Sequence, residues 1–185
     1  SHHVPCFNCH YCSESKYSAC ERLHSGNFDP GGFSEFIRVP EENVKYGTFV
    51  LPENMSYEEA SMIEPMACAV AGQKMLDPKK NDTTLVIGSG ISGLTHIQLL
   101  SEIGSKTLVT DISDYRLKKA LDFGANYSFL AEEFNQNTLR DLNQGRLADN
   151  VIVCSGNESA VRDAFQYVDK RGKILFFAIP SSDLD

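Results

Sequence analysis

The sequence predicts an α/β protein that contains a doubly wound parallel β-sheet and, before it, a smaller β-rich lobe. From residue 84 onward, short apolar runs alternate with segments whose apolar residues recur at helical spacing. This alternation is typical of strands that are joined by helices in a parallel sheet. Residues 1 to about 56 instead contain turn residues between short runs that resemble strands. We therefore expect one domain in residues 1–75 and a second, which holds the sheet, in residues 76–185.

Four cysteines near the start of the chain, Cys6, Cys9, Cys12 and Cys20, follow the spacing C-x2-C-x2-C-x7-C. Thiols this close on one loop can converge on a single ion, whereas they rarely meet the geometry of a disulfide. Tetrahedral thiolate sites favour zinc, with iron second, and the long last gap followed by Glu21 fits an iron–sulfur cluster poorly. The spacing predicts a structural zinc, since four protein ligands leave no open position for substrate. Four unrelated buried cysteines are the alternative.

The rest of the first part contains two short strand-like runs and the start of a helix. Phe33–Val39 alternates mostly between apolar and polar residues, as a half-buried strand does, and Thr48–Leu51 is a second candidate strand. Ser56 is expected to begin a helix, because Glu59 three residues later completes a capping box.

Glu64 is the only charged residue in the apolar run Met62–Val70. A buried carboxylate is unfavourable unless it is paired or binds a metal. Pro65 removes a helical hydrogen bond and should kink or restart the helix at this point. Glu64 is therefore a metal ligand, the partner of a buried cation, or a residue on the solvent side of the kink.

A strand, a glycine-rich turn and a helix follow one another from Thr84 onward. The strand Thr84–Ile87 leads into Gly88–Gly93, which matches G-x-G-x-x-G, and the helix after it should end at Gly104. A second strand, Thr107–Thr110, delivers Asp111 at 18 residues after the last glycine of the turn. This order is the context that a dinucleotide-binding fingerprint requires.

Each residue type in this fingerprint has a physical role in binding a dinucleotide. Gly88 allows the tight turn, Gly90 lets a pyrophosphate approach the backbone, and Gly93 lets the helix pack closely on the strand. Ile91 and Ser92 would present free N–H groups at the helix N-terminus to the phosphates. Asp111 would accept the ribose hydroxyls and repel a 2′-phosphate, which favours NAD over NADP. A glycine-rich turn without a nucleotide is the alternative.

The remainder of the chain continues the alternation of helices and strands. The expected elements are a helix at Tyr115–Phe123 capped by Gly124, a strand at Ala125–Leu130, a polar helix at Ala131–Asn143, a strand at Val151–Val153, a helix at Glu158–Val168 and a fifth strand at Lys173–Phe177. A usual doubly wound nucleotide sheet has six strands, so we expect one further strand beyond this chain.

Composition and charge argue against several classes of protein. The formal charge of −8 and the absence of a basic stripe disfavour a nucleic-acid partner. No apolar stretch approaches the roughly 20 residues of a membrane span, and no secretory signal opens the sequence. Six cysteines, four of them in a metal-type cluster, favour a reducing compartment, and we expect a cytoplasmic protein. The chain opens without methionine and ends just after an apolar strand, so we expect an internal piece of a longer protein.

Taken together, the cysteine lobe, the Gly32–Phe36 run and the dinucleotide fingerprint resemble the zinc-containing medium-chain dehydrogenases. Ile63–Pro65 resembles the sorbitol and threonine dehydrogenase branch of that family. The resemblance covers nearly the whole chain. It implies a structural zinc in the four-cysteine cage, a lobe that belongs to a GroES-like catalytic domain, and a Rossmann-type NAD domain that lacks its last strand. It also implies that Glu64 binds a second, catalytic zinc or lies just behind that ion, and that Arg116 flanks the adenosine ribose.

The resemblance implies an oxidoreductase that transfers a hydride from a secondary alcohol or polyol to NAD+. The family's upstream catalytic cysteine and Gly-His-Glu stretch precede the residues present, so we expect activity only from the full-length protein, as a dimer or tetramer. One alternative is an L-threonine 3-dehydrogenase-like activity. Another is a non-catalytic NAD-binding or assembly module that kept the fold and lost the chemistry.

Overall fold

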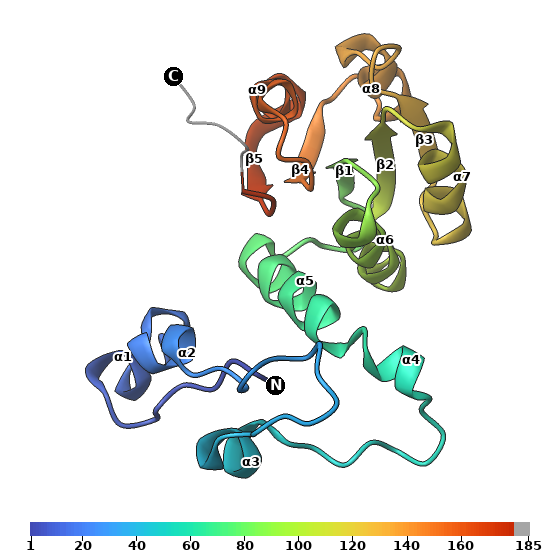
Figure 1. Ribbon diagram of the computed structural model, residues 1–185. Helices are drawn as coiled ribbons and strands as arrows, with labels where there is room; N and C mark the ends of the chain where they lie inside the picture. Colours follow the sequence, from blue (N-terminus) through green and yellow to red (C-terminus); the bar gives the residue numbers. More distant parts are fainter. Residues whose placement is uncertain (180–185) are drawn as a thin grey trace. The chain divides into compact units, whose positions relative to one another are not determined.

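The computed structural model describes residues 1–179, and the chain divides into two compact units between Glu64 and Pro65 (Figure 1). The expected final segment, residues 181–185, lies outside the described residues. The units divide inside the helix α5, Ile63–Leu76. Most of α5 belongs to the second unit, because Gly72 approaches Leu175 so closely that a Cβ there would lie 3.1 Å from the leucine. The sequence instead predicted a boundary after residue 75, and the roles assigned to the two parts stay predictions.

The first unit consists of short helices and connecting loops. Its helical elements are α1 His10–Ser13, η1 Tyr17–Ala19, α2 Glu21–Ser25, α3 Glu41–Gly47 and α4 Tyr57–Ala60. The prediction of strands at 33–39 and 48–51 is wrong within residues 1–64: pairing there is limited to an isolated antiparallel bridge between Asp29 and Arg38. Alternating apolar residues form a strand only when a neighbouring strand accepts and donates ladder hydrogen bonds. Among the described residues of this unit only Asp29 and Arg38 exchange such hydrogen bonds, and Phe33 and Val50 are exposed. The lobe is therefore not β-rich in the described residues.

The capping box at Ser56 forms as predicted. The backbone N–H of Glu59 donates to Ser56 Oγ at 3.1 Å, and the backbone N–H of Ser56 donates to Glu59 Oε2 at 2.8 Å. This helix, α4, ends at Ala60, and α5 begins at Ile63. Pro65 lies in the first turn of α5, where its missing N–H has no helical acceptor to lose. Pro65 therefore accompanies a restart of the helix, one of the two outcomes expected of it.

The second unit is built on a five-stranded parallel sheet with the strand order β3-β2-β1-β4-β5 (Figure 1). The strands are β1 Thr83–Ile87, β2 Lys106–Asp111, β3 Tyr127–Leu130, β4 Ala148–Val153 and β5 Val168–Phe176. The helices between them are α6 Ile91–Ile103, α7 Asp114–Asp122, α8 Gln136–Leu142 and α9 Glu158–Tyr167. This confirms the predicted doubly wound sheet. The order reverses between β1 and β4, so their carboxyl ends form the switch point where such sheets bind ligands.

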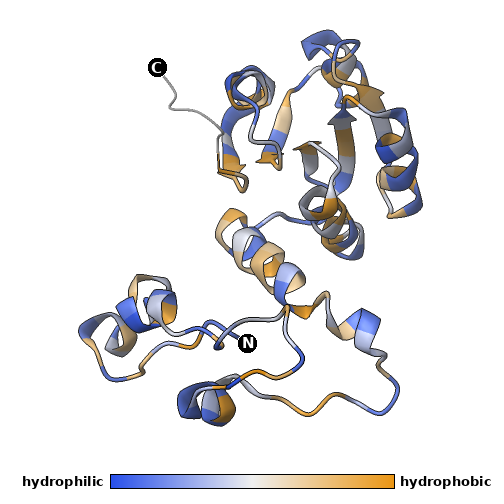
Figure 2. Ribbon diagram, in the orientation of Figure 1, coloured by the Kyte–Doolittle hydropathy of each residue, from blue (hydrophilic) through white to orange (hydrophobic). Residues whose placement is uncertain are grey.

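Two apolar layers cover the sheet, one on each face. Along β1, Leu85 packs into one cluster of buried residues and Val86 into the other, because successive strand residues point to opposite faces. The same alternation along β4 places Val151 and Val153 with Leu85, and Ile152 with Val86. All five residues of β1 are buried, as expected for a central parallel strand. Figure 2 shows α5 as a largely apolar helix, whereas α7 is mostly hydrophilic.

Helix α8 is shorter than the polar segment 131–143 that the sequence predicted as helical. It starts at Gln136 because Asn135 caps it: the Asn135 side-chain oxygen accepts hydrogen bonds from the backbone N–H groups of Asn137 and Thr138, at 2.9 and 3.2 Å.

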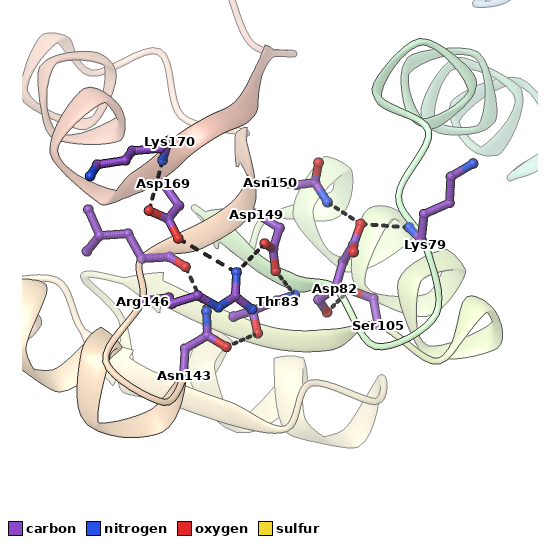
Figure 3. A network of polar contacts seen from close by, with 11 residues as sticks. Lys79, Asp82, Thr83, Ser105, Asn143, Arg146, Asp149, Asn150, Asp169 and Lys170 are labelled. Atoms are coloured by element: carbon purple, nitrogen blue, oxygen red, sulfur yellow. Dashed lines mark hydrogen bonds and ion pairs between the residues drawn. The ribbon is translucent and has the colours of Figure 1, made fainter.

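A network of polar side chains joins the strands at their amino-terminal ends (Figure 3). Asp149 accepts a hydrogen bond from the backbone N–H of Thr83 at 2.9 Å and one from Arg146 at 2.7 Å. Asn150 donates to Asp82 at 3.1 Å. These contacts fasten the start of β1 to β4 and hold the sheet in register, at the edge opposite the switch point.

Candidate functional site

The four predicted cysteine ligands lie together in the first unit. Their sulfur atoms all lie within 4.8 Å of one another. The Sγ–Sγ distances are 3.6 Å between Cys9 and Cys12, 3.7 Å between Cys6 and Cys20, and 3.9 Å between Cys6 and Cys12. A tetrahedral zinc with zinc–sulfur distances of about 2.3 Å separates its ligand atoms by about 3.8 Å. The donor set and its spacing therefore fit a zinc ion, and all four thiols are free rather than paired in disulfides.

The local fold prepares the cage electrostatically. Cys12 and Cys20 are buried, whereas Cys6 and Cys9 are half-buried. The backbone N–H of Cys6 donates to Cys20 Sγ at 3.4 Å and lowers the pKa of Cys20 to about 6. Burial, followed by the nearby Cys9 sulfur, raises the pKa of Cys12 to about 12. The Cys20 thiolate is thus already favoured, while ionising Cys12 requires a positive charge beside it, which a bound divalent cation supplies.

The cage is the one group of three or more potential metal ligands in residues 1–179 whose donor atoms converge. Glu64 is not part of it and lies exposed in the first turn of α5. Of the three possibilities that the sequence left for Glu64, burial beside a cation does not fit this exposure. Its role at a second zinc stays a prediction.

The glycine turn adopts the geometry that its residues predict. Gly88 has a φ of 93°, in the region that favours glycine. A Cβ on Gly93 would lie 2.0 Å from the carbonyl oxygen of Gly88, so α6 can approach β1 only if this residue is glycine. A Cβ on Gly90, by contrast, would meet no atom within 4 Å. Gly90 therefore leaves open space rather than permitting a contact within the protein. Ile91 and Ser92 form the first turn of α6, directly after it.

A cavity of about 240 Å³ opens at the carboxyl ends of β1, β2 and β4. Gly88, Gly90, Asp111 and Arg116, which the sequence singled out, line it. Its other wall comes from residues at the end of β4 and from α9. These are Cys154, Ser155, Asn157, Ser159, Ala160, Asp163 and Tyr167. Sequence reasoning missed this wall, because the residues match no motif and the order of the strands, which places β4 next to β1, was not predicted.

Asp111 is held in place by the glycine turn. Its side chain is 3% exposed, and Oδ2 accepts hydrogen bonds from the backbone N–H and the hydroxyl of Ser89, at 2.7 and 3.0 Å. Oδ1 accepts one from the backbone N–H of Ser113 at 3.0 Å and lies 3.9 Å from Arg116 Nη1. The carboxylate is therefore fixed in one orientation, and Oδ1 keeps capacity to accept a further hydrogen bond from a ligand.

A second, larger cavity of about 510 Å³ lies at the amino-terminal edge of the sheet, beside the polar network. Thr83, Asn143, Lys106 and Arg146 line it, and each of them already bonds within the protein. Doubly wound sheets bind ligands at the opposite edge. We therefore interpret this cavity as a consequence of how the sheet and its helices pack, and we assign ligand binding to the smaller cavity.

Comparison with known proteins agrees with the cysteine cage and the glycine turn. Residues 92–185 match the family described as zinc-binding dehydrogenase. Galactitol 1-phosphate 5-dehydrogenase of Escherichia coli K12 is 33% identical, with 98% of this chain covering 52% of that protein. Sorbitol dehydrogenase of Halalkalibacterium halodurans is 29% identical, with 91% of this chain covering 49% of that protein.

Solved structures give the same result. A protein described as a short chain alcohol dehydrogenase from Escherichia coli CFT073, complexed with NADH, superposes with a TM-score of 0.77 at 27% identity, with 98% of this chain covering 54% of that one. The chain thus spans about half the length of the relatives that it matches. Together with the cage and the glycine turn, the match over residues 92–185 shows that the chain belongs to the zinc-binding dehydrogenase family.

Proposed function

We propose that this chain is part of an NAD-dependent oxidoreductase that removes a hydride from a secondary alcohol or polyol. The observation that carries the proposal is the cavity at the switch point, where the glycine turn and a fixed, ionisable carboxylate lie on one wall. A dinucleotide needs both features: backbone N–H groups at a helix N-terminus for its phosphates, and an acceptor for its ribose hydroxyls.

Each fingerprint residue then has a defined part in binding the cofactor. The first turn of α6, from Gly90 to Gly93, would donate N–H groups to the pyrophosphate. Asp111 Oδ1 would accept a hydrogen bond from a ribose hydroxyl, and its charge would repel the 2′-phosphate of NADP. Arg116 is half-exposed at the rim of the cavity and would contact the ribose from solvent. These contacts support NAD as the preferred dinucleotide.

The metal sites have separate roles in the proposal. The four cysteines would hold a structural zinc that orders the lobe, because a closed four-thiolate site leaves no position for substrate. Glu64 is the residue of the described chain that we assign to a catalytic zinc. When bound, that zinc would act as a Lewis acid on the substrate oxygen, and NAD+ would accept the hydride.

The proposal extends to the setting of the protein. No helix among the described residues is long and apolar enough to cross a membrane. The acidic charge and the free thiols support a cytoplasmic enzyme without a nucleic-acid partner. The length of the relatives supports a full-length protein of about twice this chain, and we propose that it assembles as a homo-oligomer.

The test is an assay of NAD+ reduction by the complete protein that contains this chain, loaded with zinc. A panel of sorbitol, xylitol, galactitol 1-phosphate and L-threonine separates polyol oxidation from a threonine dehydrogenase-like activity. We expect NADH formation with at least one polyol, lost on removal of zinc and weaker with NADP+. If threonine alone yields NADH, the substrate class would be an amino acid and not a polyol.

Failure of every substrate would overturn the enzymatic proposal. Tight NAD+ binding in that case would leave a non-catalytic nucleotide-binding module. Glu64 is exposed, and it is the one residue among 1–179 that we assign to a catalytic zinc. Because a catalytic zinc is held by three protein ligands, the non-catalytic module is favoured for the chain in isolation.

A further inference from the structure

The wall of the nucleotide cavity formed by α9 contains a carboxylate that the proposed function does not use. Asp163 lines the cavity together with Ser159, Ala160 and Tyr167, all on one helix. Spacings of three and four residues place their side chains on the same face of α9. Asp163 is half-buried.

The other polar side chains on this part of the wall already have partners. The Tyr167 hydroxyl donates to the backbone oxygen of Phe134 at 3.1 Å, and the Ser159 hydroxyl donates to Asn157 Oδ1 at 2.8 Å. Asp163, in contrast, accepts no hydrogen bond from residues 1–179 of the protein. A half-buried carboxylate without a donor is unusual, since such groups are generally satisfied by protein, water or ligand.

The position of Asp163 fits one end of a dinucleotide. In the proposed function the glycine turn would take the phosphates, and Asp111 would take the adjoining ribose. Ile112 and Ala131, which adjoin Asp111, and Ala160 supply apolar surface to the same cavity, which suits the faces of a purine ring. Asp163 follows Ala160 by one helical turn of α9 and lines the same cavity, so we place its carboxylate beside the edge of the base. A carboxylate at the edge of a base selects for a base that has an N–H donor there.

We propose that Asp163 reads the exocyclic amino group of adenine and so makes the cavity specific for an adenine dinucleotide. The carboxylate would accept a hydrogen bond from the 6-amino group. It would repel a base with a carbonyl oxygen at that position, because two acceptors would then face each other. This assignment rests on the proposed NAD binding and names a specificity residue on the wall opposite the fingerprint.

The experiment compares NAD+ with nicotinamide hypoxanthine dinucleotide, in which a carbonyl replaces the 6-amino group. Both are titrated calorimetrically into the zinc-loaded protein and into its Asp163→Asn variant. The unmodified protein should bind NAD+ about tenfold more tightly, the usual effect of one hydrogen bond to a charged group. In Asp163→Asn this preference should fall to about one or reverse, because the new amide can donate to the carbonyl. Asp163 bonds to no other described group, so the variant should unfold at the same temperature.

The matched control is Asp141→Asn, which removes an exposed carboxylate of α8 outside the cavity and should leave the preference unchanged. Equal affinity of the unmodified protein for both dinucleotides would overturn the inference, as would a preference that survives in Asp163→Asn. Both results leave NAD binding intact and so differ from failure of the proposed function, in which neither dinucleotide binds.

Discussion

Replacing Gly90 by alanine should separate cofactor binding from folding. An added Cβ at this position meets no protein atom within 4 Å, and the φ of −69° is ordinary for an alanine. Gly90 is the N-cap of α6, where alanine is less favourable than glycine by up to about 1 kcal/mol. The variant should therefore fold with only a small loss of stability.

Binding should respond much more strongly than stability in Gly90→Ala. Gly90 lines the cavity, and the new methyl group would occupy the space through which the pyrophosphate approaches the backbone. Displacement of the phosphates by about an ångström is expected to weaken NAD+ binding about 100-fold, which corresponds to about 2.7 kcal/mol.

Gly93→Ala provides the contrast. Its Cβ would lie 2.0 Å from the Gly88 carbonyl oxygen, so the backbone of the turn must move, and overpacking of this kind costs about 1–3 kcal/mol. This variant should lose both stability and binding. Thermal unfolding and calorimetric titration with NAD+ measure the two effects separately. NAD+ binding that is unchanged in Gly90→Ala, or a loss of stability as large as in Gly93→Ala, would refute the reasoning.

Three further predictions concern single residues. Asp111→Asn should lower the preference for NAD+ over NADP+ at least tenfold in paired calorimetric titrations, since it removes the charge that repels a 2′-phosphate; an unchanged ratio would contradict this. His96 is fully buried, and burial lowers its pKa to about 4. Because His96 protonates near pH 6.5 in the unfolded chain and only near pH 4 in the folded chain, the free energy of unfolding should fall by roughly 3 kcal/mol as the pH drops through this window. Urea unfolding should show that His96→Gln removes this part of the pH dependence, and an identical dependence in the variant would count against it. Cys20→Ser should lose zinc to a mild chelator that leaves the unmodified protein loaded, as elemental analysis would show; full retention would speak against Cys20 as a ligand.

The sheet could be predicted from the sequence because its signals are local and agree with each other. From residue 84 onward, each segment that was expected to be a strand became one, and Gly104 and Gly124 follow the helices that they were expected to end. The two strands expected in the first unit failed because a strand depends on a neighbour elsewhere in the chain. Alternation around Phe33 gives the face of a strand but not the partner that would stabilise it.

The candidate site divides in the same way. The cysteine spacing and the glycine turn are contiguous motifs, so both could be recognised from residues alone. The hydrogen bonds from Ser89 to Asp111 join segments that are far apart in sequence. The cavity wall that α9 forms with Asp163 likewise faces residues from distant segments. Such contacts follow from the strand order, which brings β2 and β4 to either side of β1, and no local pattern reports them.

The central claim is that the chain combines a structural zinc cage with a dinucleotide fold, and the zinc content of the protein tests it most directly. The protein would be purified without added metal, dialysed against a mild chelator and subjected to elemental analysis. We predict about one tightly held zinc per chain, as the four converging thiols require. Folded, reduced protein that retains no zinc would contradict the cage and leave a nucleotide-binding domain with unexplained cysteines.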